Sequence, residues 1–436
     1  MRTPPIPGPF AVAASAGTAT EIVDALKALE DLKARACAAQ ARLAARLAAQ
    51  VRQEHRDLGL PAAKQGRGVE SQVALARRES PARGRQLLGL AKVLTDELPC
   101  TLAAMEAGPL PEWRAMLIAR ETACLSREDR ATIDTELCAP ASDGSYRFDG
   151  WGDRRLTAET QKLVACLDPA ALVNRRKRAE SERRVSLRPA PDTMARLSVL
   201  LPAAPGIAVW ATLARAADQA VADGDDRSRQ QIMVDTLVER ITGQSAATAV
   251  PVMINVVVSD DTLLVGGHEP AWLQGYGPLT ADAARDLTLR AAREATAEVR
   301  RLYAAPATGE LVSMDSSARF FPRALADFIE LRDRTCRTPW CDAPIRQADH
   351  VVPHAAGGPT TKLNGQGLCQ HCNLAKEAIG WRSRPITGPP SSRHTVVLTL
   401  PTGHTLVSTA PAAPKPATLC HRSAQEWRLL ELVLAS

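Results

Sequence analysis

The chain has 436 residues, of which 45% are hydrophobic, 23% are charged and 3% are aromatic, and its formal net charge is +6. This length exceeds one average domain of about 100–200 residues, and the composition excludes a largely disordered or a collagen-like chain. No run of about 18 apolar residues occurs, so we expect no membrane span. Abundant alanine and few aromatic residues favour helices. We therefore predict a mainly α, multi-domain protein of the α+β class.

The N-terminal region is predicted to be helical after a flexible start at residues 1–20, which are rich in Pro, Ala and Gly. Over residues 21–55, apolar side chains recur every seven residues from Ile22 to Leu43. Such a stripe is typical of a helix packed in a bundle and also of a dimerising coiled coil. A homodimer therefore stays open.

Two shorter helices are predicted over residues 70–78 and 81–94, because Ser80 is a good N-cap for the second of them. Two helices joined by a short turn could simply pack together. They could also form a DNA-binding helix-turn-helix, with Arg83 and Arg85 on the second helix.

The middle of the chain is predicted to be mixed. A turn-rich composition over residues 139–190 suggests a subdivision of an N-terminal domain that extends over residues 21–310. A strand, two helices and another strand follow in a βααβ-like order. Their expected ranges are 194–201, 203–221, 227–241 and 252–258.

Residues 174–188 carry seven basic and two acidic side chains, a net charge of +5. Such a run is typical of a solvated helix face, and it could also contact phosphates. The candidate phosphate-binding residues are Arg175, Arg176, Lys177 and Arg178.

The C-terminal part is predicted to contain one compact domain over residues 320–384. Residues 385–436 are expected to form a Pro/Ser-rich linker, a β-hairpin over 394–408 and a terminal helix that ends near Leu434.

The ten cysteines fall into two groups. Six are scattered singly, which indicates buried free thiols in a reducing compartment. The N-terminus lacks the pattern of a signal peptide, so we expect a cytoplasmic protein. The other four form two close pairs, Cys336/Cys341 and Cys369/Cys372. Two such pairs predict a closed, structural Zn²⁺ site with four sulfur ligands.

A second set of polar residues lies between and beside these pairs. Asp349 and His350 end a predicted strand, Asn364 follows a Gly-rich loop, and Asn373 comes directly after the last cysteine. Neighbouring side chains on a strand point to opposite sides, so one can face a metal while the other faces a water. Carboxylate and amide oxygens suit Mg²⁺, and histidine is the side chain best suited to accept a proton near neutral pH.

The pattern D-H…N…C-x2-C-N-x2-K, preceded by C-x4-C, resembles the HNH endonucleases. The likeness is specific over residues 336–381, and residues 21–300 resemble the domain of unknown function that precedes the nuclease in one actinobacterial branch. It implies a C-terminal treble-clef-like ββα-metal domain that hydrolyses DNA, with double-stranded DNA as the expected partner. Asn373 stands where many members have His, which favours Mg²⁺ or Mn²⁺ as the catalytic ion.

The resemblance also implies a role for each residue. His350 would be the general base, Asn364 would steady the loop and orient His350, and Asp349 and Asn373 would hold the catalytic ion. Lys362, Lys376 and Arg382 are further candidates for phosphate contacts. Either His354 or His371 could replace His350 as the useful imidazole. The alternative to a nuclease is a zinc ribbon that binds nucleic acid without cutting it.

Overall fold

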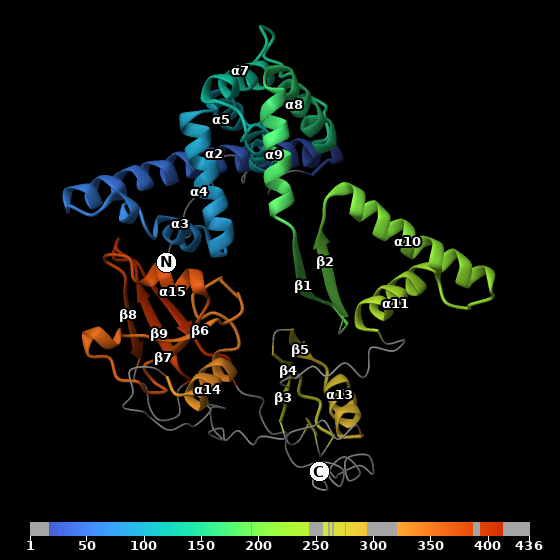
Figure 1. Ribbon diagram of the computed structural model, residues 1–436. Coiled ribbons are helices and arrows are strands. Elements are labelled where there is room, and N and C mark those ends of the chain that lie inside the picture. The colour runs from blue at the N-terminus through green and yellow to red at the C-terminus, as the bar shows by residue number, and fades with distance from the viewer. Residues whose placement is uncertain are drawn as a thin grey trace. The chain divides into compact units, whose positions relative to one another are not determined.

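The computed structural model describes residues 17–192, 194–243, 256–259, 262–263, 266–274, 276–293, 321–386 and 393–412 (Figure 1). These residues are mostly helical and include four small sheets, which confirms the expected mainly helical class. The expected terminal helix near Leu434 and most of the flexible start lie outside the described residues. The chain divides into two compact units, one with residues 17–175, 321–386 and 394–410, and one that begins at Arg176.

The helical part of the first unit is a bundle around one apolar core. Its core includes Leu94, Met105, Ile118, Ile133 and Phe148, all with side chains at most 2% exposed. The helices of the bundle are α2 (Ala19–Asp57), α3 (Val69–Arg77), α4 (Pro81–Asp96), α5 (Pro99–Ala107), α6 (Glu112–Glu121), α7 (Arg127–Cys138) and α8 (Asp153–Leu167), with a short 3-10 helix, η1 (Ala62–Lys64).

Helix α2 confirms the predicted long helix, but the heptad stripe was wrong. Ile22 and Leu43, which belong to that stripe, are 47% and 63% exposed. The buried positions include Ala34, Ala38 and Ala41, and the helix packs on α4 and α5. Small alanines allow close helix packing, so they form the contact face instead of the larger leucines. The helix therefore packs in a bundle.

Helices α3 and α4 confirm the predicted pair, and Ser80 accepts a hydrogen bond from the backbone of Arg83 as the N-cap. The two helices touch closely, since a Cβ atom at Gly84 would lie 2.4 Å from the Cβ atom of Ala74. The arginines of the helix-turn-helix interpretation have partners inside the protein. Arg83 lies 3.7 Å from the carboxylate of Glu112, and Arg85 contacts a histidine ring described below. These contacts favour the interpretation as two packed helices.

The described residues of the second unit form two small antiparallel sheets and three helices, in addition to the end of a helix that begins in the first unit. Strands β1 (Arg184–Ala190) and β2 (Met194–Leu200) form a hairpin, and β3 (Val256–Val257), β4 (Ala271–Leu273) and β5 (Gly277–Leu279) form the second sheet. The three helices are α10 (Ala203–Ala222), α11 (Arg229–Thr242) and α13 (Ala281–Arg293).

One expectation for this middle region is confirmed and another needs correction. The βααβ-like order is present along the chain as β2, α10, α11 and β3, and in it β2 pairs with β1 and β3 pairs with β4. The basic run over residues 174–188 does not form one helix face. Helix α9 (Pro169–Ser181) ends inside it, and residues from Arg184 onward lie in strand β1.

The C-terminal part of the first unit has a ββα core. Helix α14 (Arg323–Asp333) precedes strands β6 (Gln347–His350) and β7 (Gly365–Leu368), which pair antiparallel, and helix α15 (Gln370–Lys376) follows. A short 3-10 helix, η3 (His354–Ala356), lies between the two strands. This order matches the ββα arrangement expected from the sequence.

A separate sheet follows this core. It consists of β8 (Arg382–Ile386), β9 (Thr395–Thr399) and β10 (Thr405–Thr409), with β9 in the centre. The predicted hairpin is therefore present as β9 and β10. The predicted domain boundary at residue 384 falls inside β8, which pairs along its whole length with β9.

Candidate metal centre and active site

Four cysteines meet where the ββα core begins. Cys336 and Cys341 come from the loop after α14, Cys369 is the N-cap of α15, and Cys372 lies in its first turn. All four are buried, and their sulfur atoms lie within 4.8 Å of one another.

The spacing of the sulfurs fits zinc. The Cys341 Sγ atom lies 3.7 Å from the Sγ atoms of both Cys369 and Cys372. A tetrahedral Zn²⁺ with bonds of about 2.3 Å requires sulfurs about 3.8 Å apart. The predicted grouping of the four cysteines is confirmed, and they form a candidate zinc site with no position left for substrate.

His350 ends strand β6 in a buried position. Its side chain is in contact with the ring of Phe321, 4.5 Å between centroids, and its Nε2 atom lies 2.9 Å from the Thr360 hydroxyl. The residue is only 7% exposed. Burial lowers the pKa of His350 against the opposing effect of the Asp349 carboxylate, so the ring is mostly neutral at pH 7. A neutral ring can accept a proton.

Asp349 lies on the other side of the same strand. Its Oδ2 atom is buried and receives no well-oriented hydrogen bond among the described residues, although the ammonium group of Lys376 forms an ion pair with it. The Lys376 Nζ atom also donates to the His350 carbonyl oxygen at 2.7 Å. A buried carboxylate oxygen whose partner is a cationic group can also serve as a ligand for a metal ion.

Asn373 faces the same strand from helix α15. Its amide nitrogen donates to the Gln347 Oε1 atom, and Gln347 is two residues before Asp349 on β6. Residues two apart on a strand share a face, so Gln347, Asp349 and the helix residue Asn373 border one region. Carboxylate and amide oxygens fit the hard ligand set of Mg²⁺ or Mn²⁺.

Asn364 holds the loop between the two strands. Its Oδ1 atom accepts from the Val352 backbone N–H at 2.9 Å, and its Nδ2 atom donates to the carbonyl oxygens of Val352 and Pro359. The backbone at Gly358 passes so close to Val352 that a Cβ atom at Gly358 would lie 1.9 Å from the Val352 carbonyl oxygen. These contacts fix the loop that carries Thr360.

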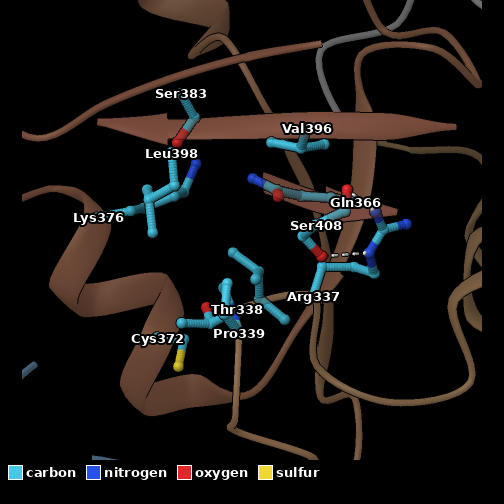
Figure 2. A pocket seen from close by; sticks show the side chains of 11 residues that line it. Arg337, Thr338, Pro339, Gln366, Cys372, Lys376, Ser383, Val396, Leu398 and Ser408 are labelled. Carbon is cyan, nitrogen blue, oxygen red and sulfur yellow. Dashed lines mark hydrogen bonds between the residues drawn. The ribbon is translucent and has the colours of Figure 1, made fainter. Parts of the chain in front are cut away.

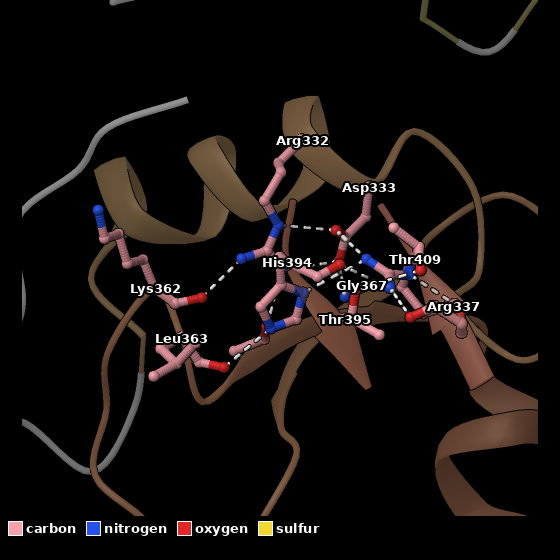
Figure 3. Close-up of polar contacts among 11 residues, drawn as sticks. Arg332, Asp333, Arg337, Lys362, Leu363, Gly367, His394, Thr395 and Thr409 are labelled. Atoms are coloured by element: carbon pink, nitrogen blue, oxygen red, sulfur yellow. Dashed lines mark hydrogen bonds and ion pairs between the residues drawn. The ribbon is translucent and has the colours of Figure 1, made fainter. Parts of the chain in front are cut away.

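A buried polar network surrounds Asp333 at the end of α14 (Figure 3). Asp333 has no exposed side-chain surface and pairs with both Arg332 and Arg337, and it accepts from the Gly367 backbone N–H at 2.7 Å. Arg337 donates to backbone oxygens of β10 and of His394, which precedes β9. The network thus joins α14, β7 and the C-terminal sheet.

Sequence reasoning missed this network and also the roles of Thr360 and Phe321. The sequence signal for the network is the group of charged residues around Cys336, namely Arg332, Asp333 and Arg337. Charged side chains near a metal motif are more often solvated, so the pattern alone could not show burial.

The cavity next to the site is too small for a substrate. It is about 20 Å³ and is lined by Arg337, Gln366, Lys376 and Ser383, among others (Figure 2). This volume holds about one water molecule.

The predicted phosphate contacts differ in their surroundings. Arg175 is held by the buried Glu121, to which it donates at 2.8 Å, and Lys376 is held by Asp349. Lys177 and Arg382 are exposed, and Lys362 is half-buried. The side chains of Arg176 and Arg178 lie outside the described part of the structure.

The two alternative histidines have other surroundings. His354 lies edge-on to His350, with 5.6 Å between ring centroids. His371, between two of the cysteines, contacts the Ser71 hydroxyl at 3.1 Å and the Arg85 guanidinium at 2.8 Å. Both of its ring nitrogens thus have partners in the helical part, which favours a structural role.

Comparisons with known proteins agree with this architecture. The domain of unknown function DUF222 matches residues 25–333, and the HNH endonuclease family matches residues 336–378. No helix among the described residues is long and apolar enough to cross a membrane.

Two curated relatives come from Mycobacterium tuberculosis. The uncharacterized protein Rv3776 is 34% identical over 119 residues, which are 24% of this chain and 23% of that protein. The uncharacterized protein Rv2100 is 39% identical over 84 residues, which are 19% of this chain and 14% of that protein. The chain therefore spans less than a quarter of the length of either relative. No solved structure matches it significantly. Because the DUF222 match covers more than half of the chain, the protein belongs to that family and carries an HNH endonuclease domain after it.

Proposed function

We propose that this protein hydrolyses the phosphodiester bonds of DNA at the site formed by β6, β7 and α15. The observation that carries the proposal is the pairing of a buried, neutral His350 with a buried Asp349 oxygen on the opposite side of one strand. A proton acceptor and an anionic oxygen ligand thus come from consecutive residues of β6, within the segment that matches HNH endonucleases.

In this proposal His350 removes a proton from the attacking water. The proposal requires the tautomer in which Nε2–H donates to the Thr360 hydroxyl, 2.9 Å away, so that the lone pair of Nδ1 receives that proton. Asp349 and Asn373 would hold Mg²⁺ or Mn²⁺, which stabilises negative charge on the phosphate and on the leaving oxygen when bound. Asn364 fixes the loop, and the four cysteines would hold a structural Zn²⁺.

Contacts to the substrate are assigned by charge and accessibility. Arg382 is exposed on β8, and Lys362 lies on the loop before β7. We keep both, with Arg176, Lys177 and Arg178, as proposed phosphate contacts. Arg175 is left out because it is held by Glu121. Double-stranded DNA as substrate, a cytoplasmic location and a homodimer remain part of the proposal.

The second candidate function is a zinc module that binds nucleic acid without cutting it. The ion pair between Lys376 and Asp349 favours this candidate, because the ammonium group already neutralises the carboxylate. Only a nuclease needs His350 and the divalent ion, so cleavage separates the two functions.

The test is plasmid cleavage by the purified full chain with Mg²⁺ or Mn²⁺. We expect the wild type to cut and His350→Ala to be slower by roughly 10²–10⁴-fold, because a general base contributes that much. His350→Ala should retain zinc and DNA binding. His354→Ala is the matched control and should cut within about twofold of the wild type, an order-of-magnitude expectation for a group outside the proton transfer. If the wild type binds DNA but never cuts under either ion, the binding-module function holds instead.

A further inference from the structure

The β1–β2 hairpin of the second unit has one strongly basic face. In an antiparallel pair, residues directly opposite each other lie on the same face. Arg188 lies opposite Arg196, and Arg184 lies on the same face of β1 as Arg188. All three side chains are exposed. The other face of the hairpin is apolar, because Val185 lies opposite Val199 and Leu187 lies opposite Leu197.

Two arginines in directly opposite positions oppose the folding of a hairpin. Like charges across a strand pair destabilise it, and a two-stranded hairpin has little stability of its own. None of the three arginines has an ion pair within the described residues. Elsewhere in the same unit, Arg227 pairs with Asp225 and Asp235, and Arg229 pairs with Asp218. Among the described residues, Arg227 and Arg229 thus have carboxylate partners, whereas these three arginines have none.

The hairpin has a fixed place within its own unit. The hydroxyl group of Tyr276, which precedes β5, lies 3.0 Å from the Ala190 carbonyl oxygen and 2.8 Å from that of Met194. Both oxygens lie where the two strands turn. The basic face therefore belongs to an anchored element.

We propose that this basic face binds the phosphates of double-stranded DNA. Guanidinium groups match phosphate oxygens in pairs and remain charged at any physiological pH. Arg184 and Arg188 are four residues apart, about 13 Å along an extended strand. This span is comparable to the width of the major groove, about 12 Å, which admits a two-stranded ribbon between its phosphate edges. A DNA phosphate also supplies the counter-charge that the Arg188–Arg196 pair lacks.

This inference rests on the proposed nucleic-acid substrate, and it assigns binding to a unit that lacks the nuclease residues. Its test measures binding alone, in the His350→Ala background and without added divalent ions, so cleavage cannot enter the result. The probe is a fluorescent duplex of about 30 base pairs, titrated at several salt concentrations to give the slope of log affinity against log salt.

We expect Arg188→Gln/Arg196→Gln to lower DNA affinity at least tenfold and to reduce the salt slope by about 1.8, which is about 0.9 for each lost phosphate contact. The melting temperature should stay the same or rise, because the like-charge contact is gone. Arg188→Lys/Arg196→Lys should retain most of the binding. The matched control, Arg227→Gln/Arg229→Gln, makes the same charge change in the same unit and should leave the slope unchanged.

An unchanged slope in the hairpin variant overturns the proposal, and so does an equal loss in the control variant. If the double variant fails to fold, the single Arg196→Gln variant decides, with an expected slope change of about 0.9. Tighter binding of a matched RNA duplex than of DNA would also overturn the assignment. If the His350→Ala parent chain binds no DNA at all, the proposed substrate itself is wrong. If the parent binds DNA and the hairpin variant binds it equally well, only the assignment to the hairpin is wrong.

Discussion

The hydrogen bond between Thr360 and His350 offers a test of the proposed base at the scale of one residue. Thr360→Val keeps the shape of the side chain but removes the 2.9 Å contact of the hydroxyl group with the Nε2 atom of His350. We expect kcat for plasmid cleavage to fall roughly 5–10-fold, since one hydrogen bond contributes about 1 kcal/mol. KM and the zinc content should not change. A variant as fast as the wild type would show that Thr360 does not position His350.

Lys376 provides a second residue-scale test, because its ammonium group is paired with the Asp349 carboxylate. A divalent ion must compete with this charge. We therefore expect Lys376→Gln to bind Mn²⁺ more tightly than the wild type when measured by calorimetry. Lys362→Gln removes the same charge from a half-buried lysine whose Nζ atom is not paired with Asp349, so it is the matched control and should bind Mn²⁺ as the wild type does. Weaker binding by Lys376→Gln would contradict the expected competition.

Residue types and spacing were sufficient to predict the cysteine cluster, because a zinc site needs two close pairs of thiols and little else. The same reasoning could not predict that Lys376 faces Asp349, since the sequence favoured an exposed phosphate contact. That pairing depends on how helix α15 lies against β6, which no local pattern encodes. Arg175 is a similar case, because its partner Glu121 is 54 residues away along the chain.

At the scale of elements, His394 connects the C-terminal sheet to the ββα core. Its Nε2 atom lies 2.8 Å from the Leu363 carbonyl oxygen, and its side chain is near Arg337. Burial, together with the nearby Arg332 charge, lowers the pKa of His394 to about 4. The folded protein therefore holds this ring neutral at pH values where an unfolded chain would protonate it.

The free energy of unfolding should consequently depend on pH. As the pH falls below about 6.5, the His394 ring of the unfolded chain becomes protonated, whereas the same ring in the folded chain stays neutral until about pH 4. The free energy of unfolding is therefore highest above pH 6.5, and it decreases by roughly 3 kcal/mol in total as the pH falls from 6.5 to 4. Urea unfolding at pH 7.5, 5.5 and 4.5 measures the change, and His394→Gln should flatten it. An equal pH dependence in this variant would assign the effect to other groups.

Helices and strands were predicted best where residues within or beside the element determine where it begins. Ser80 marks the start of α4 as expected, because a hydroxyl group satisfies a free backbone N–H. Strand β1 was not predicted, because the dense charge of this segment favoured a solvated helix face. In the strand, Val185 and Leu187 alternate with Arg184, Ser186 and Arg188. The stripe on α2 was wrong because tertiary packing, and not the size of the apolar side chains, selects the buried face.

At the scale of the whole molecule, the helical part and the zinc-bearing part of the first unit have different main cores, and the helical part shares a smaller apolar cluster with the C-terminal sheet, in which Leu75 of α3 packs with Leu398 and Leu400. The helical core contains large apolar side chains from several helices, such as Leu94 and Ile133. The core near the candidate zinc site consists of the four cysteines and Leu368, with Ala343 packed against it. So small an apolar cluster cannot hold the two cysteine pairs together without another source of stability.

Removal of zinc should therefore unfold only the zinc-bearing part. A structural zinc contributes about 10–16 kcal/mol in small modules, comparable to the whole stability of a domain. With a strong chelator, or in Cys341→Ser, we expect proteolysis to begin within residues 336–378 while the helical signal in circular dichroism falls only slightly. About one zinc per chain should be released, as a colorimetric zinc indicator measures. The contacts of His371 with Ser71 and Arg85 would be lost together with the knuckle, but the helical core does not depend on them. Unfolding of both parts in one step would contradict the independence of the two cores, and protein purified without chelators that contains no zinc would contradict the metal site.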